Sequence, residues 1–120
     1  MLKLNSSKDN NQKPSYFDLV YDVTKMIPEG RVSTYGAIAD FLALGSARMV
    51  GWALNHCHHL ENNIPAHRVV NRKGELSGRM HFSTPKAMEE ALTREGIEII
   101  DDKVVKMDRL FWHPRNIEMT

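Results

Sequence analysis

The residues best suited to chemistry lie together in a short apolar run at positions 64–70. The run contains His67, which could act as a general base, and Arg68, which could pair with a carboxylate or a phosphate. The preceding residue, Ala66, carries a methyl group that can neither attack a substrate nor donate a proton. The run therefore predicts a strand that offers a base but no nucleophile.

Two other pairings could supply catalytic groups. Cys57 is the only cysteine and could be a displaced nucleophile with His67 as its base, although single cysteines are more often small buried residues. Glu95 could be the carboxylate that orients His67. Because nothing beside this second pair can attack, we expect it to be a hydrogen-bonded pair that holds the floor of a pocket.

Four consecutive residues, His56, Cys57, His58 and His59, raise the alternative of a metal site. Adjacent residues at a helix end point in different directions, and a structural zinc site usually requires two separated pairs of ligands. We therefore expect a solvated helix terminus, where histidine suits the negative end of the helix dipole. We expect neither a metal nor another cofactor.

Length and composition indicate one globular domain. The chain has 120 residues, of which 42% are apolar and 26% charged, and its 16 basic and 15 acidic residues leave a net charge of +1. The middle of the chain is the basic part: positions 31–86 hold Arg31, Arg48, Arg68, Arg72, Lys73, Arg79 and Lys86 against Asp40, Glu61 and Glu75. A nucleic-acid footprint would therefore come from the distribution of charge.

The expected compartment follows from the cysteine count. One cysteine cannot form an internal disulfide, which suits a reducing cytoplasm. No apolar run approaches the roughly 20 residues that span a bilayer, and no apolar secretion signal opens the chain. We expect a cytoplasmic monomer with no membrane partner.

Apolar residues recur at helical spacing from position 15, where Ser15 and Asp18 form a candidate N-cap pair, and residues 28–30 end this first helix. Thr34 is the expected N-cap of a second helix and Ser46 that of a third. Two short helices joined by a glycine-containing turn predict a helix-turn-helix.

After the central run, residues 76–82 lack periodicity and predict an ordered loop. Thr84 and Pro85 are expected to open a helix that stops at Gly96. Residues 97–100 and 104–107 predict a hairpin.

These elements predict a helix-rich α/β fold. It is a single domain over residues 15–114, with a helix-turn-helix, a short central strand and a small C-terminal hairpin. Residues 1–14 are expected to be a flexible tail, and residues 115–120 a second one.

Four ordered segments, at 27–39, 46–51, 64–70 and 94–96, resemble the O6-alkylguanine-DNA alkyltransferases. That family moves an alkyl group onto the cysteine of a Pro-Cys-His-Arg-Val segment, and Ala66 stands at the cysteine position here. The chain thus resembles the alkyltransferase-like branch, which binds alkylated guanine without removing the alkyl group.

The chain departs from the family pattern at two points and matches the alkyltransferase-like branch at two others. The branch most often has tryptophan at the position of Ala66, and residues 56–63 depart from the family's turn after the recognition helix. Residues 74–79 place Arg79 where the branch reads the alkylated base, and residues 111–114 resemble its C-terminal aromatic segment.

The resemblance implies a role for each matching residue. Arg48 would enter the base stack where the damaged nucleotide leaves, and Tyr35 would rotate the phosphate and line the pocket. The implied DNA contacts are Thr34, Tyr35, Ala47, Arg48 and Gly51, in the minor groove. The implied base pocket is Tyr35, Pro65, Ala66, His67, Val69, Ser77 and Arg79. The implied structural support is His67, Arg68 and Glu95.

The expected function is therefore non-enzymatic: the protein flips an O6-alkylguanine out of double-stranded DNA, holds it, and flags it for nucleotide excision repair proteins. Three alternatives remain open. The chain could be a true methyltransferase whose acceptor cysteine was changed to Ala66. It could be a helix-turn-helix transcription regulator that prefers an undamaged sequence. It could be a metal-dependent hydrolase that uses the histidine cluster.

Overall fold

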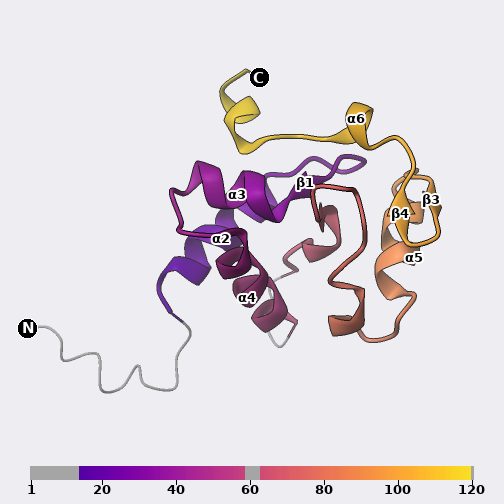
Figure 1. Ribbon diagram of the computed structural model, residues 1–120, viewed down its shortest axis with the longest axis horizontal. Helices are drawn as coiled ribbons and strands as arrows, with labels where there is room; N and C mark the ends of the chain where they lie inside the picture. Colours follow the sequence, from indigo (N-terminus) through magenta and orange to yellow (C-terminus); the bar gives the residue numbers. More distant parts are fainter. Residues whose placement is uncertain (1–13, 59–62, 120) are drawn as a thin grey trace, which may run out of the picture.

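The helices and strands form two groups that are joined by the central run of the chain. The computed structural model describes residues 14–58 and 63–119, so the predicted tail at 1–14 lies outside it except for Pro14. Helices α2 (Tyr16–Lys25), α3 (Tyr35–Phe41) and α4 (Ala47–Cys57) make up one group (Figure 1). Helix α5 (Ala87–Arg94) and strands β3 (Ile99–Ile100) and β4 (Lys103–Val104) make up the other. None of the helices in these described ranges is long and apolar enough to cross a membrane.

The predicted helix-turn-helix forms from α3 and α4. Thr34 caps α3 as predicted, because its Oγ1 accepts a hydrogen bond of 3.0 Å from the N–H of Ala37. Ser15 and Ser46 stand at the predicted N-cap positions of α2 and α4, but neither side chain makes a capping hydrogen bond. The backbone of Ser15 is helical, whereas a capping residue usually has an extended backbone that lets its side chain accept from the first turn.

The predicted central strand is only partly a strand. Ala66–Arg68 form a 3-10 turn, η2, and only Val69–Val70 form strand β2. The cause is Pro65, whose φ of −79° and ψ of 64° make a tight three-residue turn in which the Ala66 N–H donates to the Ile64 carbonyl at 2.7 Å. Strand β2 then pairs in parallel with β1 (Ser33–Thr34).

The C-terminal hairpin is present but shorter than predicted. Strands β3 (Ile99–Ile100) and β4 (Lys103–Val104) are antiparallel, and the two residues between them, Asp101 and Asp102, both have positive φ angles. Such a turn matches the right-handed twist of the strands. The predicted second strand ends early because Met107–Leu110 form a short helix, α6.

Three further elements differ from the prediction. Helix α5 begins at Ala87, because Thr84 and Pro85 form a turn in which the Thr84 carbonyl accepts from the Ala87 N–H. The predicted loop contains a 3-10 turn, η3 (Arg79–His81). The predicted C-terminal tail takes part in a 3-10 helix, η4 (Pro114–Met119). At the end of α5 the prediction is confirmed, with Gly96 at a φ of +86°.

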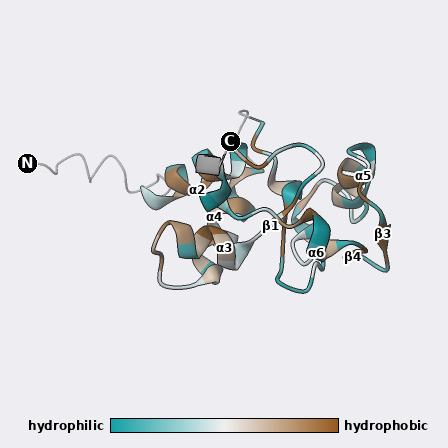
Figure 2. Ribbon diagram, turned by 90° about the horizontal axis from the view of Figure 1, so that it is seen from above, coloured by the Kyte–Doolittle hydropathy of each residue, from teal (hydrophilic) through white to brown (hydrophobic). Residues whose placement is uncertain are grey.

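Strand β2 divides the interior into two apolar clusters. Val69 packs with α2, α3 and α4, whereas Val70 packs with the buried side chains of α5 and the hairpin. Consecutive residues of a strand point to opposite faces, so two adjacent valines serve both clusters. Figure 2 shows the hydrophobic β3 at one end of the molecule, with β4 between it and the mostly hydrophilic α6. The fold is helix-rich α/β, as predicted.

Candidate nucleic-acid interface

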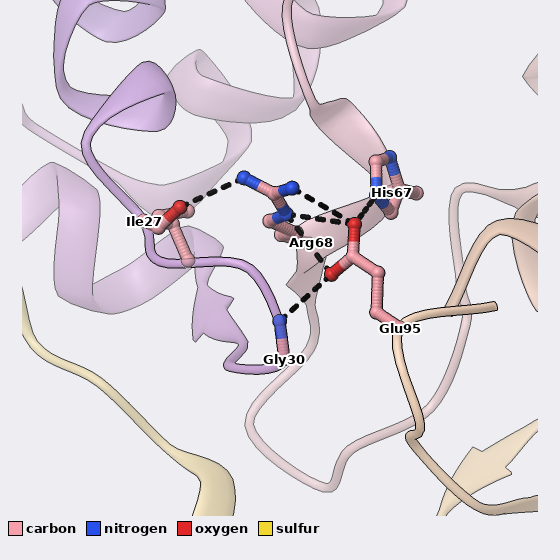
Figure 3. A network of polar contacts seen from close by, with 5 residues as sticks. All are labelled: Ile27, Gly30, His67, Arg68 and Glu95. Atoms are coloured by element: carbon pink, nitrogen blue, oxygen red, sulfur yellow. Dashed lines mark hydrogen bonds and ion pairs between the residues drawn. The ribbon is translucent and has the colours of Figure 1, made fainter. Parts of the chain in front are cut away.

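A network of hydrogen bonds surrounds the Glu95 carboxylate (Figure 3). Arg68 donates to it through Nε at 3.1 Å and through a terminal nitrogen at 2.8 Å, and His67 Nε2 lies 2.7 Å from Oε2. The Gly30 N–H donates at 2.9 Å, and Arg68 also donates to the Ile27 carbonyl at 2.9 Å. The predicted pair of His67 and Glu95 is therefore confirmed, as part of a larger set.

The network keeps the carboxylate ionised. Burial alone would raise the pKa of Glu95, but hydrogen bonds from Arg68, from the Gly30 N–H and from His67 outweigh it and lower that pKa to about 2. With both its oxygens occupied, Glu95 is fixed at the end of α5 and in turn fixes η2. Through these hydrogen bonds Glu95 ties the end of α5 to η2 and to the segment that follows α2.

Ala66 immediately precedes this supported pair and is buried. Its side chain packs in the first apolar cluster, against which Tyr35 and Phe82 are also placed. Pro65 before it and Val69 after it complete the short turn that holds it. The position is buried and apolar, and its side chain, a methyl group, has no nucleophilic atom.

A groove of about 520 Å³ lies along the exposed face of α4. It is lined by Tyr35, Ala47, Arg48, Gly51, Trp52 and Asn55. Four of the five residues expected to contact DNA are thus brought together, and Thr34 directly precedes them as the cap of α3. Arg48 is exposed and forms no ion pair with any described residue.

Tyr35 connects this groove to the loop that carries Ser77. Burial raises the pKa of the Tyr35 hydroxyl, and a hydrogen bond with Ser77 partly opposes this rise. A Cβ built on Gly78 would lie only 2.7 Å from the Tyr35 hydroxyl oxygen, so this position has room for glycine alone while Tyr35 stays in place. The loop and the helix-turn-helix are therefore fitted to each other at this tyrosine.

Arg79 has a structural partner that its sequence context did not indicate. Its Nε lies 3.5 Å from an Asp102 carboxylate oxygen, and its guanidinium donates to the Leu76 carbonyl at 3.2 Å. With Ser77 it lines a polar hollow of about 410 Å³ that also contains Glu75 and Asp101. The turn of the hairpin, at Asp102, thus gives Arg79 a structural contact that its place in a nonperiodic loop does not indicate.

The histidine cluster is dispersed. The ring of His56 lies 5.6 Å from that of Phe17, whereas the ring of His58 lies 4.4 Å from that of Phe82. Cys57 is buried between them, and burial raises the pKa of its thiol to about 11, which opposes nucleophilic use. His59 lies outside the described residues, and among those described no three histidine, cysteine or acidic side chains could share a metal ion.

Two surface features were missed in the sequence. Trp52 is 54% exposed in the α4 groove, and its spacing of four residues from Arg48 was the available signal. A second hollow, of about 600 Å³, has Thr34 on one side and is bordered by Arg72, Lys73 and Lys103. Its cations come from the turn at Arg72 and Lys73 and from Lys103 on β4, which are distant in the sequence, so no local pattern indicated it.

The fold and site define a small helix-turn-helix domain. In it, His67 and Arg68 both contact the Glu95 carboxylate and directly follow the buried Ala66. Residues 15–97 match the DNA-binding domain of the 6-O-methylguanine DNA methyltransferase family, so the chain belongs to this family. Two relatives match over most of their length. Alkyltransferase-like protein 1 of Schizosaccharomyces pombe is 36% identical over 104 residues, covering 82% of this chain and 95% of that protein. The DNA base-flipping protein of Escherichia coli is 30% identical over 112 residues, covering 92% of this chain and 84% of that protein.

A solved structure matches the fold as well. The crystal structure of S. pombe Atl1 in complex with damaged DNA containing O6-carboxymethylguanine superposes with a TM-score of 0.75 at 33% sequence identity. The match covers 86% of this chain and 99% of that chain.

The Glu95 network predicts a specific dependence of stability on pH. The folded pKa of about 2 lies below the ordinary 4.5, so the stabilisation is complete above pH 4.5 and is lost as the pH falls toward 2. We expect Glu95→Gln to lower the free energy of unfolding at pH 7 by about 3 kcal/mol, and the difference from wild type to shrink steadily below pH 4.5. Urea unfolding across this pH range measures both. Glu90→Gln, on the exposed face of α5, should change neither, and a constant deficit for Glu95→Gln at all pH values would contradict the assignment.

Proposed function

We propose that this protein binds O6-alkylguanine in double-stranded DNA, rotates the damaged nucleotide out of the helix and holds it without transferring the alkyl group. Similarity to a base-flipping protein and to a protein solved with damaged DNA supports the ligand class. The exposed Arg48 in the α4 groove supports the mode of contact.

The observation that carries the proposal is the contrast between Ala66 and its surroundings. The chain retains a complete hydrogen-bonded support in His67, Arg68 and Glu95, yet the residue that this support positions has no reactive atom. A support of this kind is useful without a nucleophile if the pocket serves to hold a base. Under this proposal the protein is a binder and has no transferase activity.

Extrusion of a base costs a few kcal/mol and costs least for a damaged base that pairs poorly. In the proposed complex Arg48 fills the gap in the stack, and Tyr35, fixed by Ser77, turns the phosphate of the departing nucleotide. Thr34, Ala47 and Gly51 contact the minor groove beside them.

The proposed pocket lies over Ala66, with Pro65, His67 and Val69 around its floor and Tyr35 and Ser77 at its side. A methyl group at the floor leaves room for a longer alkyl chain. Arg79 donates to the base after it leaves Asp102, the partner that holds it in the unbound protein.

A lesion that is held and not repaired must be removed by another system, and we propose that nucleotide excision repair proteins are the partners. We also propose that the protein acts as a monomer in a reducing cytoplasm, since its one cysteine, Cys57, cannot form an internal disulfide.

The direct test is a binding titration with one duplex that carries either guanine or O6-methylguanine at a single position. We expect tighter binding to the alkylated duplex, because the modified base pairs poorly and costs less to extrude. Fluorescence anisotropy of the labelled duplex measures both affinities. Equal affinities, or a preference that follows the surrounding sequence, would favour a transcription regulator.

A second measurement separates holding from transfer. Incubated with excess O6-methylguanine duplex, the protein should keep its mass, because transfer requires a thiolate at the floor of the pocket. Intact-mass spectrometry detects the alternative, a gain of about 14 Da with restoration of guanine. Such a gain would overturn the proposal. Ala66→Cys is the matched variant: if it accepts the methyl group, the surrounding support is that of a transferase.

Gly51 should show opposite effects on stability and binding. Glycine inside a helix costs roughly 0.5–1 kcal/mol relative to alanine, and a Cβ at Gly51 would meet nothing within 4 Å. Gly51→Ala should therefore raise the free energy of unfolding by up to about 1 kcal/mol and weaken DNA binding, because the added methyl group stands in the contact face. Thr93→Ala on α5 is the control that should stabilise the helix without altering affinity. Unchanged binding by Gly51→Ala would place the DNA elsewhere.

A further inference from the structure

Trp52 is the large side chain on the α4 face that no role yet accounts for. It is 54% exposed, whereas the other tryptophan, Trp112, is 4% exposed and packs in the first apolar cluster. Its neighbours in the helix, Ala53 and Leu54, are buried, so the helix already has its core-facing stripe without Trp52. An exposed ring of this size is not explained by packing.

The position of Trp52 relative to Arg48 is set by the helix. Residues four apart lie on one face, about 6 Å apart along the axis. Both side chains line the same groove, together with two small residues, Ala47 and Gly51. The open space over Gly51 allows another molecule's backbone to approach the helix closely between the two large side chains.

The chemistry of this face suits a nucleic acid. Its lining residues include one cation and no acid, and Trp52 and Asn55 add N–H donors for the acceptor atoms on the edges of minor-groove bases. Proteins that bind the minor groove often insert apolar side chains that part the bases and widen the groove. A spacing of about 6 Å corresponds to less than two base-pair steps of about 3.4 Å.

We propose that Trp52 is a second residue that enters the minor groove, packing against the sugars and base edges next to the gap that Arg48 fills. This rests on the proposed function and adds a specificity-determining contact to it. Arg48 replaces the extruded base, and Trp52 holds the neighbouring base pairs apart so that the nucleotide stays out. The pair acts as two prongs one helical turn apart.

The tryptophans themselves provide the readout. Acrylamide quenches exposed tryptophan, so in the free protein it reaches Trp52 and spares the buried Trp112. Addition of an unlabelled duplex with one O6-methylguanine should protect Trp52 from acrylamide and change its emission. Trp52→Phe, which retains Trp112, should lose this response.

Affinity gives an independent measure. Trp52→Ala should bind the alkylated duplex about tenfold more weakly, on the scale of a lost stacking contact. Because the ring is uncharged, the slope of the logarithm of affinity against the logarithm of salt concentration should stay at the wild-type value. Arg48→Ala, in contrast, should reduce that slope, because it removes a positive charge from the interface. The urea-unfolding midpoint of Trp52→Ala should match wild type, which excludes a folding defect.

Ile100→Ala is the matched control. Ile100 is equally exposed, at 55%, but lies on β3 at the other end of the molecule (Figure 1), and its truncation should leave binding unchanged. Binding of the alkylated duplex without protection of Trp52, or with full affinity in Trp52→Ala, would overturn the inference and leave the proposed function intact. Absence of any duplex binding by wild type would instead overturn the proposed function, and this inference with it.

Discussion

The structure depends on one largely buried carboxylate. Glu95, at the end of α5, accepts hydrogen bonds from two other segments. One donor is Gly30 in the segment that follows α2, and the others belong to the 3-10 turn that follows Pro65. Three segments from distant parts of the sequence are thereby fixed at one point, and burial of the charge is tolerable because each oxygen is occupied. Removal of Arg68 or of Glu95 would leave the charge of the other uncompensated, so the network behaves as a unit.

The consequence for the surface is that the two apolar clusters keep a defined relative orientation. The helix-turn-helix belongs to the first cluster and the hairpin to the second. Val69 packs into the first cluster and Val70 into the second. Tyr35 crosses from the first to the loop beside the second, where only a glycine at position 78 leaves space for its hydroxyl. These contacts hold the α4 groove and the buried Ala66 in a fixed arrangement.

The sequence predicted those parts of the fold whose causes are local. Thr34 and Gly96 were correctly placed because a cap and a left-handed terminus depend on the residue itself. The run around Ala66 was predicted as a strand because its apolar pattern gives no sign of the turn at Pro65. The ion pair of Arg79 and the exposure of Trp52 escaped prediction because both depend on which segments pack nearby. The hydrogen bond between His67 and Glu95 was predicted from the chemistry of the two side chains. The hydrogen bond from the Gly30 N–H to Glu95 could not be predicted, because it depends on how distant segments pack.

The methyl group of Ala66 has a kinetic meaning. A protein that takes an alkyl group onto its own sulfur is consumed by a single event, whereas a floor that forms no covalent bond leaves both molecules unchanged on separation. Under the proposed function each copy is therefore reusable, and coverage of lesions follows from the number of copies and the dissociation rate. Residence time then becomes the quantity under selection, since a complex that dissociates before another protein arrives conveys no signal.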